Sequence, residues 1–152
     1  MPRQRKALSD AALEMIAERF KLLAEPMRLK ILHTLWDGEL TDAALEMIAE
    51  RFKLLAGPMR LKILHTLWDG ELTVGEIGTA TGALQANVSK HLGILQLAGL
   101  VRRRREGLNK YYAIADEAIF ALCEVVCNSL HDRLALQIEQ LPQPAGQRRA
   151  ER

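Results

Sequence analysis

Residues 10–41 of the chain are followed directly by a second copy of themselves, residues 42–73, and the two copies differ only where Glu25 becomes Gly57. Two copies this similar have not drifted apart, so the duplication is recent or engineered. Any fold of this chain must therefore place two nearly identical segments. Only the second copy leads straight into the distinctive pattern of the remaining chain, so function is inferred from residues 42–140.

Each copy has the apolar spacing of two helices. In the second copy, apolar residues recur on one helical face at Leu45, Ile48, Ala49, Phe52, Leu55 and Ala56. Pro58 suits the first position of a following helix, which is predicted over residues 59–68. Asp69 and Gly70 then end that helix. Residues 10–38 follow the same plan.

The two copies continue differently. Thr73 is followed three residues later by Glu76, which completes a capping box for another helix. Thr41 is followed three residues later by Ala44, which cannot complete a capping box. We therefore place the second copy in the native position and interpret residues 10–41 as an extra helix pair inserted ahead of it.

The extra helix pair is predicted to fold and pack. It has an apolar face of about eight large side chains, and leaving that face in water forfeits roughly 1.5–3 kcal/mol per side chain. We expect residues 10–38 to form helices that pack either on the chain's own dimer or in the partner's position by a domain swap. Fast, uniform hydrogen exchange across these residues would contradict the expectation.

A helix-turn-helix and a hairpin are predicted after the repeat. The elements are, in order, a helix over 74–81, a turn at Gly82, a helix over 84–98, strands over 100–105 and 110–114 around a loop at 106–109, and a helix over 116–141. The last helix carries an apolar stripe at Ile119, Phe120, Cys123, Val126, Cys127, Leu130, Leu134 and Ile138. This order predicts a mainly α winged helix-turn-helix with a two-stranded β-hairpin wing and an extra N-terminal helix pair.

Polar side chains that suit base and phosphate contacts gather on the predicted helix 84–98. Gln85 and Asn87 suit bidentate contacts with adenine in the major groove. Ser89, Lys90 and His91 can reach bases or phosphates. We expect all five to contact DNA.

The predicted hairpin adds a basic stripe. It contains Arg102, Arg103, Arg104, Arg105 and Lys110. Such a stripe is an electrostatic footprint for phosphate, although a solvated hairpin face is the alternative. We expect four of its members to follow the DNA backbone or to enter the adjacent minor groove, namely Arg102, Arg103, Arg105 and Lys110.

The string TGALQANVSKHLGILQLAGLVRRRREGLNKYYAI closely resembles the core of the ArsR/SmtB family of bacterial metalloregulatory repressors. LLAGPMRLKILHTL and its twin LLAEPMRLKILHTL resemble that family's second-helix signature, and the resemblance covers residues 42 to about 138. It implies a recognition helix at 84–98, a wing at 100–114 and a homodimer formed through the first and last helices. It also implies a repressor that binds a palindromic operator in double-stranded DNA and releases it when an inducer binds. Leu84 departs from the family, whose members commonly carry a serine there, and leucine caps a helix poorly.

Two of the family's metal sites are not expected in this chain. Its arsenic and cadmium site is a Cys-x-Cys near the start of the third helix, and residues 71–78 contain no cysteine. Its zinc site on the last helix would match Asp116 and Asp132, but Ala118 and Ser129 stand at the histidine positions.

Two cysteines remain as candidate sensors of the inducer. Cys123 and Cys127 are four residues apart, so they lie on one face of the last helix. Their thiolates can share a soft ion such as As(III) or Cu(I), with a ligand from the partner subunit or with His131 as a third ligand, or they can be oxidised as a redox signal. The alternative is that both only pack as small apolar residues.

The remaining features exclude several protein classes. No apolar run is long enough to span a membrane, and the two cysteines do not form a disulfide framework, so a cytoplasmic location is expected. The chain has no Cys-x-x-Cys, His-Glu-x-x-His or glycine-rich phosphate loop, so it is not expected to be an enzyme. We divide it into a basic segment (1–9), the extra helix pair (10–41), a winged helix-turn-helix domain for DNA binding and dimerisation (42–140) and a disordered tail (141–152).

The sequence is consistent with two functions. The first is a dimeric, sequence-specific repressor that a metal, metalloid or redox inducer releases from its operator. The alternative is a protein-interaction or dimerisation module whose DNA binding is impaired by the duplication. Salt-sensitive binding to a palindromic site would favour the first.

Overall fold

The computed structural model describes residues 8–36, 38 and 40–140, apart from the side chain of Ile138. The predicted disordered tail and most of the basic N-terminal segment lie outside the described residues. The repeat forms four helices, which are α1 (Asp10–Leu23), α2 (Pro26–Leu35), α3 (Asp42–Leu55) and α4 (Pro58–Thr66). The prediction that the first copy forms two helices is confirmed over Asp10–Leu23 and Pro26–Leu35.

The repeat helices begin where the sequence supplies caps. The Ser9 and Thr41 hydroxyls accept hydrogen bonds from the backbone N–H groups of Ala12 and Ala44, both at 3.1 Å. Proline opens both α2 and α4, where its missing N–H costs no helical hydrogen bond. The predicted second helix of the second copy ends as a short 3-10 turn, η1 (Leu67–Asp69), rather than continuing as an α-helix.

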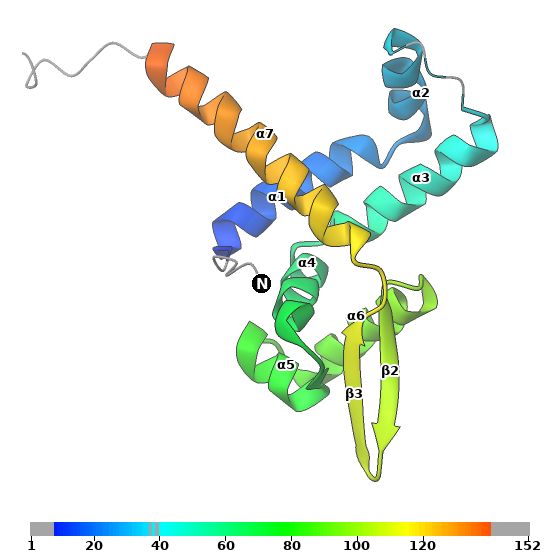
Figure 1. The fold of residues 1–152 in the computed structure, drawn as a ribbon, viewed down its shortest axis with the longest axis vertical. Coiled ribbons are helices and arrows are strands. Elements are labelled where there is room, and N and C mark those ends of the chain that lie inside the picture. Colours follow the sequence, from blue (N-terminus) through cyan, green and yellow to red (C-terminus); the bar gives the residue numbers. More distant parts are fainter. Residues whose placement is uncertain (1–7, 37, 39, 141–152) are drawn as a thin grey trace, which may run out of the picture.

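The rest of the chain forms the predicted winged helix-turn-helix. Its elements are β1 (Leu72–Thr73), α5 (Val74–Thr81), α6 (Gln85–Leu97), β2 (Val101–Glu106), β3 (Asn109–Ile114) and α7 (Ala118–Gln140). In Figure 1 the β2–β3 hairpin projects from the body at the end opposite to the free end of α7. The capping box is confirmed, because Thr73 and Glu76 each bond the other's backbone N–H.

The wing differs from the prediction in two details. The sheet has three antiparallel strands in the order β1–β3–β2, because Leu72 and Thr73 pair with Tyr112 and Tyr111. A two-residue strand has too little pattern to be seen in the sequence. The predicted loop 106–109 is a tighter turn, since Glu106 already pairs with Asn109. Gly107 permits this turn by adopting a φ of 60°, which side chains disfavour.

The main core joins the winged helix-turn-helix to the first copy of the repeat. α1 packs against α4 and α7, and its Leu13, Ile16 and Phe20 are buried there (Figure 1). The buried members contributed by the other elements include Leu61, Ile63, Leu64, Ile77, Val88, Leu92, Leu95, Val101, Tyr112, Ile119 and Cys123. The sequence did not predict that the first copy would supply a helix to this core.

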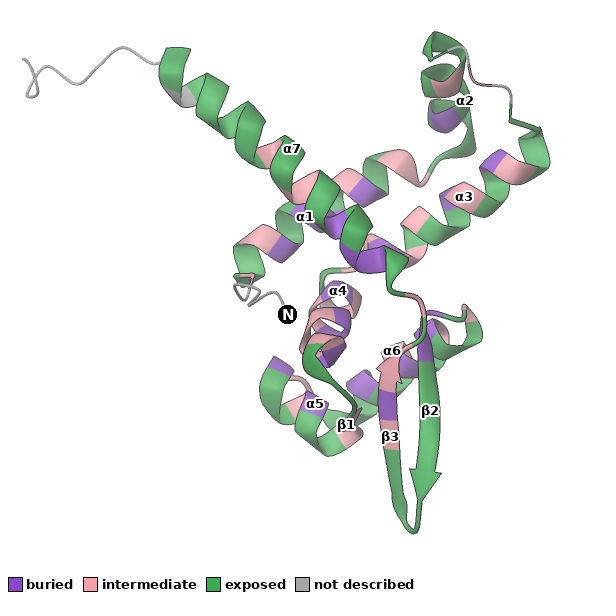
Figure 2. Cartoon of the chain, viewed as in Figure 1, coloured by how far each residue is buried: buried purple, intermediate pink, exposed green. Residues whose placement is uncertain are grey.

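Helices α2 and α4 have the same sequence but different surroundings. Ile63, Leu64 and Leu67 are 0–2% exposed, whereas their counterparts Ile31, Leu32 and Leu35 are 55%, 48% and 80% exposed. α4 and the η1 turn that follows it lie against α5, α6 and β3, while α2 lies against α3 and extends from the body (Figure 2). Among the described residues, no helix is long and apolar enough to cross a bilayer.

Candidate nucleic-acid interface

Helix α6 presents one polar and one apolar face. Val88, Leu92 and Leu95 are fully buried and hold the helix against α4 and α5. Four of the five side chains proposed from the sequence to contact DNA are exposed on the other side, namely Gln85, Asn87, Ser89 and Lys90. The helix is therefore fixed by its apolar side chains and leaves these polar groups available to a ligand.

The N-terminal end of α6 lacks a side-chain cap. Leu84 occupies the N-cap, where it makes no capping hydrogen bond and is 82% exposed. Its carbonyl accepts from the backbone N–H groups of Asn87 and Val88. The first N–H groups of the helix thus have no side-chain acceptor among the described residues, and they add partial positive charge beside Gln85.

His91 is placed differently from the other four. It is half-buried, and its Nδ1 is buried without a hydrogen-bond partner among the described residues. Burial lowers the pKa of His91, and the charges of Arg60 and Lys90 lower it further. The imidazole is therefore disfavoured in its charged form, and it is less suited than Lys90 to pair with a phosphate.

The wing arginines separate into two groups. Arg104 donates to both carboxylate oxygens of Glu71, at 2.7 and 3.2 Å, and to Glu106 at 2.6 Å, and it lies over the ring of Tyr111. These bonds raise the pKa of Arg104 and lower the pKa of Glu71. Arg102 donates to the backbone carbonyl of Ile114. Arg104 thus braces the wing against the segment before β1, and its charge is largely offset.

The other basic side chains of the wing face solvent. Arg103, Arg105 and Lys110 are exposed, and no carboxylate of the described residues forms an ion pair with them. Arg105 and Lys110 are direct cross-strand partners, so like charges lie side by side near the tip of the hairpin. Because β2 lies against α6, this positive edge and the polar face of α6 belong to one unit.

Sequence reasoning did not identify two residues that shape this unit. Glu71 lies 33 positions before its partner Arg104, and no periodic pattern links them. Arg60 lies on α4, close enough to His91 to lower the pKa of that imidazole. Both interactions become apparent only when the helices and the wing are folded together.

The candidate sensing cysteines lie on α7, one turn apart. Cys123 is buried in the main core, and Cys127 is half-buried at its edge. Burial raises the pKa of the Cys123 thiol to about 12, and Cys127 adds to the rise. Within the part of the chain that the structure describes, no three His, Cys, Asp or Glu side chains of one chain come together as a metal site.

Known proteins resemble this chain in sequence and in fold. The pattern of the bacterial regulatory protein, arsR family, matches residues 57–103. The HTH-type transcriptional regulator Rv0324 of Mycobacterium tuberculosis is 44% identical over 121 residues, which are 78% of this chain and 39% of that protein. The chain thus spans well under half the length of this curated relative.

Two solved structures share the winged helix-turn-helix. The crystal structure of M. tuberculosis Rv0081 is 37% identical, with a TM-score of 0.54 over 59% of this chain and 91% of that one. The solution structure of the homodimeric winged helix-turn-helix DNA-binding domain of Mb0332 from Mycobacterium bovis, described as a possible ArsR-family transcriptional regulator, is 40% identical, with a TM-score of 0.54 over 60% of this chain and 85% of that fragment. By family pattern, sequence identity and fold together, this chain belongs to the ArsR family of bacterial transcriptional regulators, a family of regulators and not of enzymes.

Proposed function

We propose that the chain is a sequence-specific DNA-binding transcriptional repressor that works as a homodimer on a palindromic operator. One observation carries the proposal: the exposed polar face of α6 and the positive edge of the wing belong to elements that pack on each other. A major groove admits one helix, and a neighbouring hairpin then lies along the backbone or the minor groove.

The two parts of the unit have different roles in this proposal. Gln85 and Asn87 at the start of α6 read base edges, for which adenine is the best match. Ser89 and Lys90 contact bases or phosphates, and His91 has a smaller role because burial lowers its pKa. The wing side chains contribute phosphate contacts, which fix the register of α6 without reading sequence.

The proposed dimer contact is on α7. Leu122, Val125, Leu134 and Leu136 are large apolar side chains of α7 that remain exposed in the single chain. The resemblance also places the first helix of the family at the interface, which is α3 in this chain, and Met47 of α3 is exposed. The domain of Mb0332 is described as homodimeric, and a two-fold dimer matches the symmetry of a palindromic site.

The repeat is interpreted as a tandem duplication of the first two helices of this fold. Support comes from the sequence, in which both copies carry the same helix-proline-helix unit, and from α1–α2 and α3–α4, which form it twice.

A second, more specific proposal is that an inducer binds or oxidises Cys123 and Cys127 and thereby releases the protein from its operator. The two thiols are one turn apart on α7, where a soft metal, a metalloid such as As(III) or an oxidant would alter the proposed dimer contact. Burial of Cys123 opposes this, because a thiol whose pKa is about 12 forms little thiolate. Cys123→Ser and Cys127→Ser should leave operator binding intact and abolish release by As(III), and release that persists would leave the cysteines only a packing role.

A gel-shift titration with the chain's own upstream DNA tests the proposed function. Gln85→Ala and Asn87→Ala should weaken binding and relax sequence preference, each by about 1–3 kcal/mol at the contacted base pair. Gln96→Ala is the matched control, because Gln96 is an exposed glutamine near the other end of α6. Equal affinities for all variants would contradict the assignment, and no binding at any salt concentration would favour the alternative of a protein-interaction module.

A further inference from the structure

The two copies of the repeat lie crosswise. α1 of the first copy packs more extensively against α4 of the second copy than against α2 of its own. In the same way, α3 of the second copy packs more extensively against α2 of the first copy than against α4 (Figure 1). The two first helices pack on each other, and each packs more extensively on the second helix of the other copy than on the second helix of its own copy.

Two equivalent ion pairs join the copies. The Asp10 carboxylate lies 2.9 Å from the Lys62 ammonium, and the Asp42 carboxylate lies 3.0 Å from the Lys30 ammonium. Asp10 and Asp42 occupy the same position in their copies, and so do Lys30 and Lys62. One contact thus occurs twice, with the copies exchanged.

The apolar contacts are repeated in the same way. The smaller cluster on α2 and α3 contains Leu29, Leu45 and Ala49, with Leu23, Ile48 and Phe52 packed on it. The main core contains the counterpart of each of these residues, namely Leu61, Leu13, Ala17, Leu55, Ile16 and Phe20. Phe20 and Phe52 are themselves counterparts, and their rings stack with centroids 5.8 Å apart.

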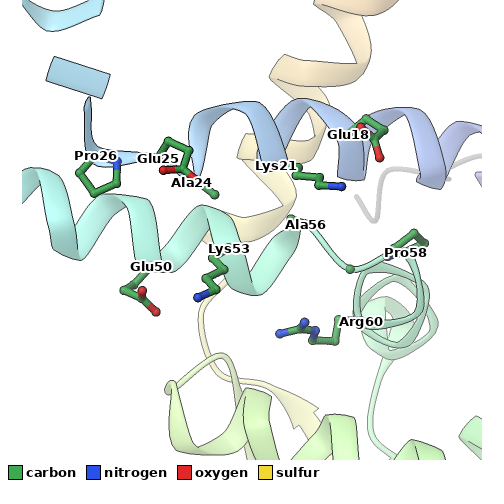
Figure 3. A pocket seen from close by; sticks show the side chains of 11 residues that line it. Glu18, Lys21, Ala24, Glu25, Pro26, Glu50, Lys53, Ala56, Pro58 and Arg60 are labelled. Carbon is green, nitrogen blue, oxygen red and sulfur yellow. The ribbon is translucent and has the colours of Figure 1, made fainter. Parts of the chain in front are cut away.

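These contacts relate the copies by an approximate two-fold axis that passes between Phe20 and Phe52. Reciprocal contacts between equivalent residues are the property of an isologous interface between two identical units. The pocket between α1, α3 and α4 shows the same relation, because its lining includes Glu18 with Glu50 and Lys21 with Lys53 (Figure 3).

We propose that helices α1–α4 form a homotypic pairing interface, in which the two copies of the repeat in one chain bind each other. The occupant of the surface on one copy of the repeat is the other copy in the same chain, so a second chain does not enter it. Self-association then requires a different surface, such as the exposed side chains of α7. This pairing depends only on the repeat and does not require that the chain binds DNA.

The same axis accounts for the exposed face of α2. α2 occupies the position that corresponds to α4, but the chain has one α5–α6 unit for two copies of the repeat. That unit covers Ile63 and Leu64 on α4, and within the described residues no element covers Ile31 and Leu32 on α2. The pair of repeats is therefore symmetric at its centre and asymmetric at its outer faces.

Cross-linking of full-length variants tests the proposal. In a Cys123→Ser/Cys127→Ser background, two crossed variants carry cysteines at the ion pairs, as Asp10→Cys/Lys62→Cys and Lys30→Cys/Asp42→Cys. Two uncrossed controls use the same four positions, as Asp10→Cys/Lys30→Cys and Asp42→Cys/Lys62→Cys. All four variants should fold, because ion pairs that water can reach contribute little stability, and both pairs have at least one exposed partner. Each is treated with a short bismaleimide as an equal mixture of ¹⁵N-labelled and unlabelled chains, and the products are analysed by denaturing mass spectrometry.

We expect both crossed variants to give one chain plus one linker, and both controls to stay unlinked. Links that join a labelled to an unlabelled chain in the crossed variants would overturn closure within one chain and would indicate a domain swap. Links in the uncrossed controls, or none in the crossed variants, would overturn the crosswise pairing. DNA binding is not a readout, so failure here is distinguishable from failure of the proposed function.

Discussion

Truncation of the same leucine in the two copies should have unequal effects on stability. Leu64 in α4 and Leu32 in α2 have identical local sequences, but their side chains are 1% and 48% exposed. Leu64→Ala and Leu32→Ala are therefore a matched pair within one protein. Helix propensity changes equally in both, so the difference between them reports tertiary packing alone.

The magnitudes follow from the burial of each side chain. Leu64 packs in the main core, so Leu64→Ala removes transfer energy and leaves a cavity, at a cost of about 2–5 kcal/mol. Leu32 is half in water and leaves no closed cavity, so Leu32→Ala should cost less than about 1 kcal/mol. A loss of about 3 kcal/mol lowers the Tm of a chain of this size by roughly 6–12 °C.

Urea unfolding followed by circular dichroism measures both free energies of unfolding. The variants are compared at one protein concentration, because self-association shifts apparent stability. Equal destabilisation by the two substitutions would refute the reasoning, since α2 would then be buried as α4 is. A loss of less than about 1 kcal/mol for Leu64→Ala would also refute the reasoning, because it would show that α4 is not the helix packed in the core.

Three further predictions concern the candidate site. Leu84→Ser supplies the missing cap of α6 and should raise the free energy of unfolding by about 0.5–2 kcal/mol in urea titrations, and an unchanged value would show that the cap is already satisfied. Arg103→Ala should reduce the slope of log affinity against log salt concentration by about 1. Arg104→Ala should leave that slope unchanged, because two carboxylates already pair with Arg104. Equal slopes for the two variants would contradict this division. Cys123 in a Cys127→Ser chain should resist iodoacetamide at pH 8 until urea unfolds the protein. The free energy of unfolding should also fall as the pH rises from about 8.5 to about 12, because the thiol ionises at a lower pH in the unfolded chain than in the folded one. Urea titrations against a Cys123→Ser control measure this fall.

The elements of the fold were predictable because local patterns specify them. The 3.6-residue spacing of apolar residues predicted the helices, and two short runs on either side of a glycine-containing loop predicted the wing. Thr73 and Glu76 predicted the start of α5, and the structure shows their reciprocal bonds. The exposed faces of Gln85 and Asn87 followed from the apolar stripe on the opposite side of α6.

The partners of the repeat helices were not predictable from the sequence. The two copies have the same apolar faces, so no pattern within the repeat decides which first helix covers α4. Interactions between distant residues were also missed, such as the ion pair of Arg104 with Glu71 and the effect of the Arg60 charge on the pKa of His91. Such contacts depend on how elements pack, which a one-dimensional pattern does not encode.

The different burial of α2 and α4 must originate outside the repeated sequence. Thr41 and Thr73 are counterparts, and each caps the helix that follows it. After Thr73 the chain enters α5 with Glu76 completing the capping box, and Leu72 and Thr73 pair with β3. After Thr41 it enters α3 instead. The connection from α4 thus ties that helix directly to the sheet and to α5. For α2 to replace α4, those strand pairs and the capping box would have to break, so chain connectivity selects between two otherwise equivalent helices.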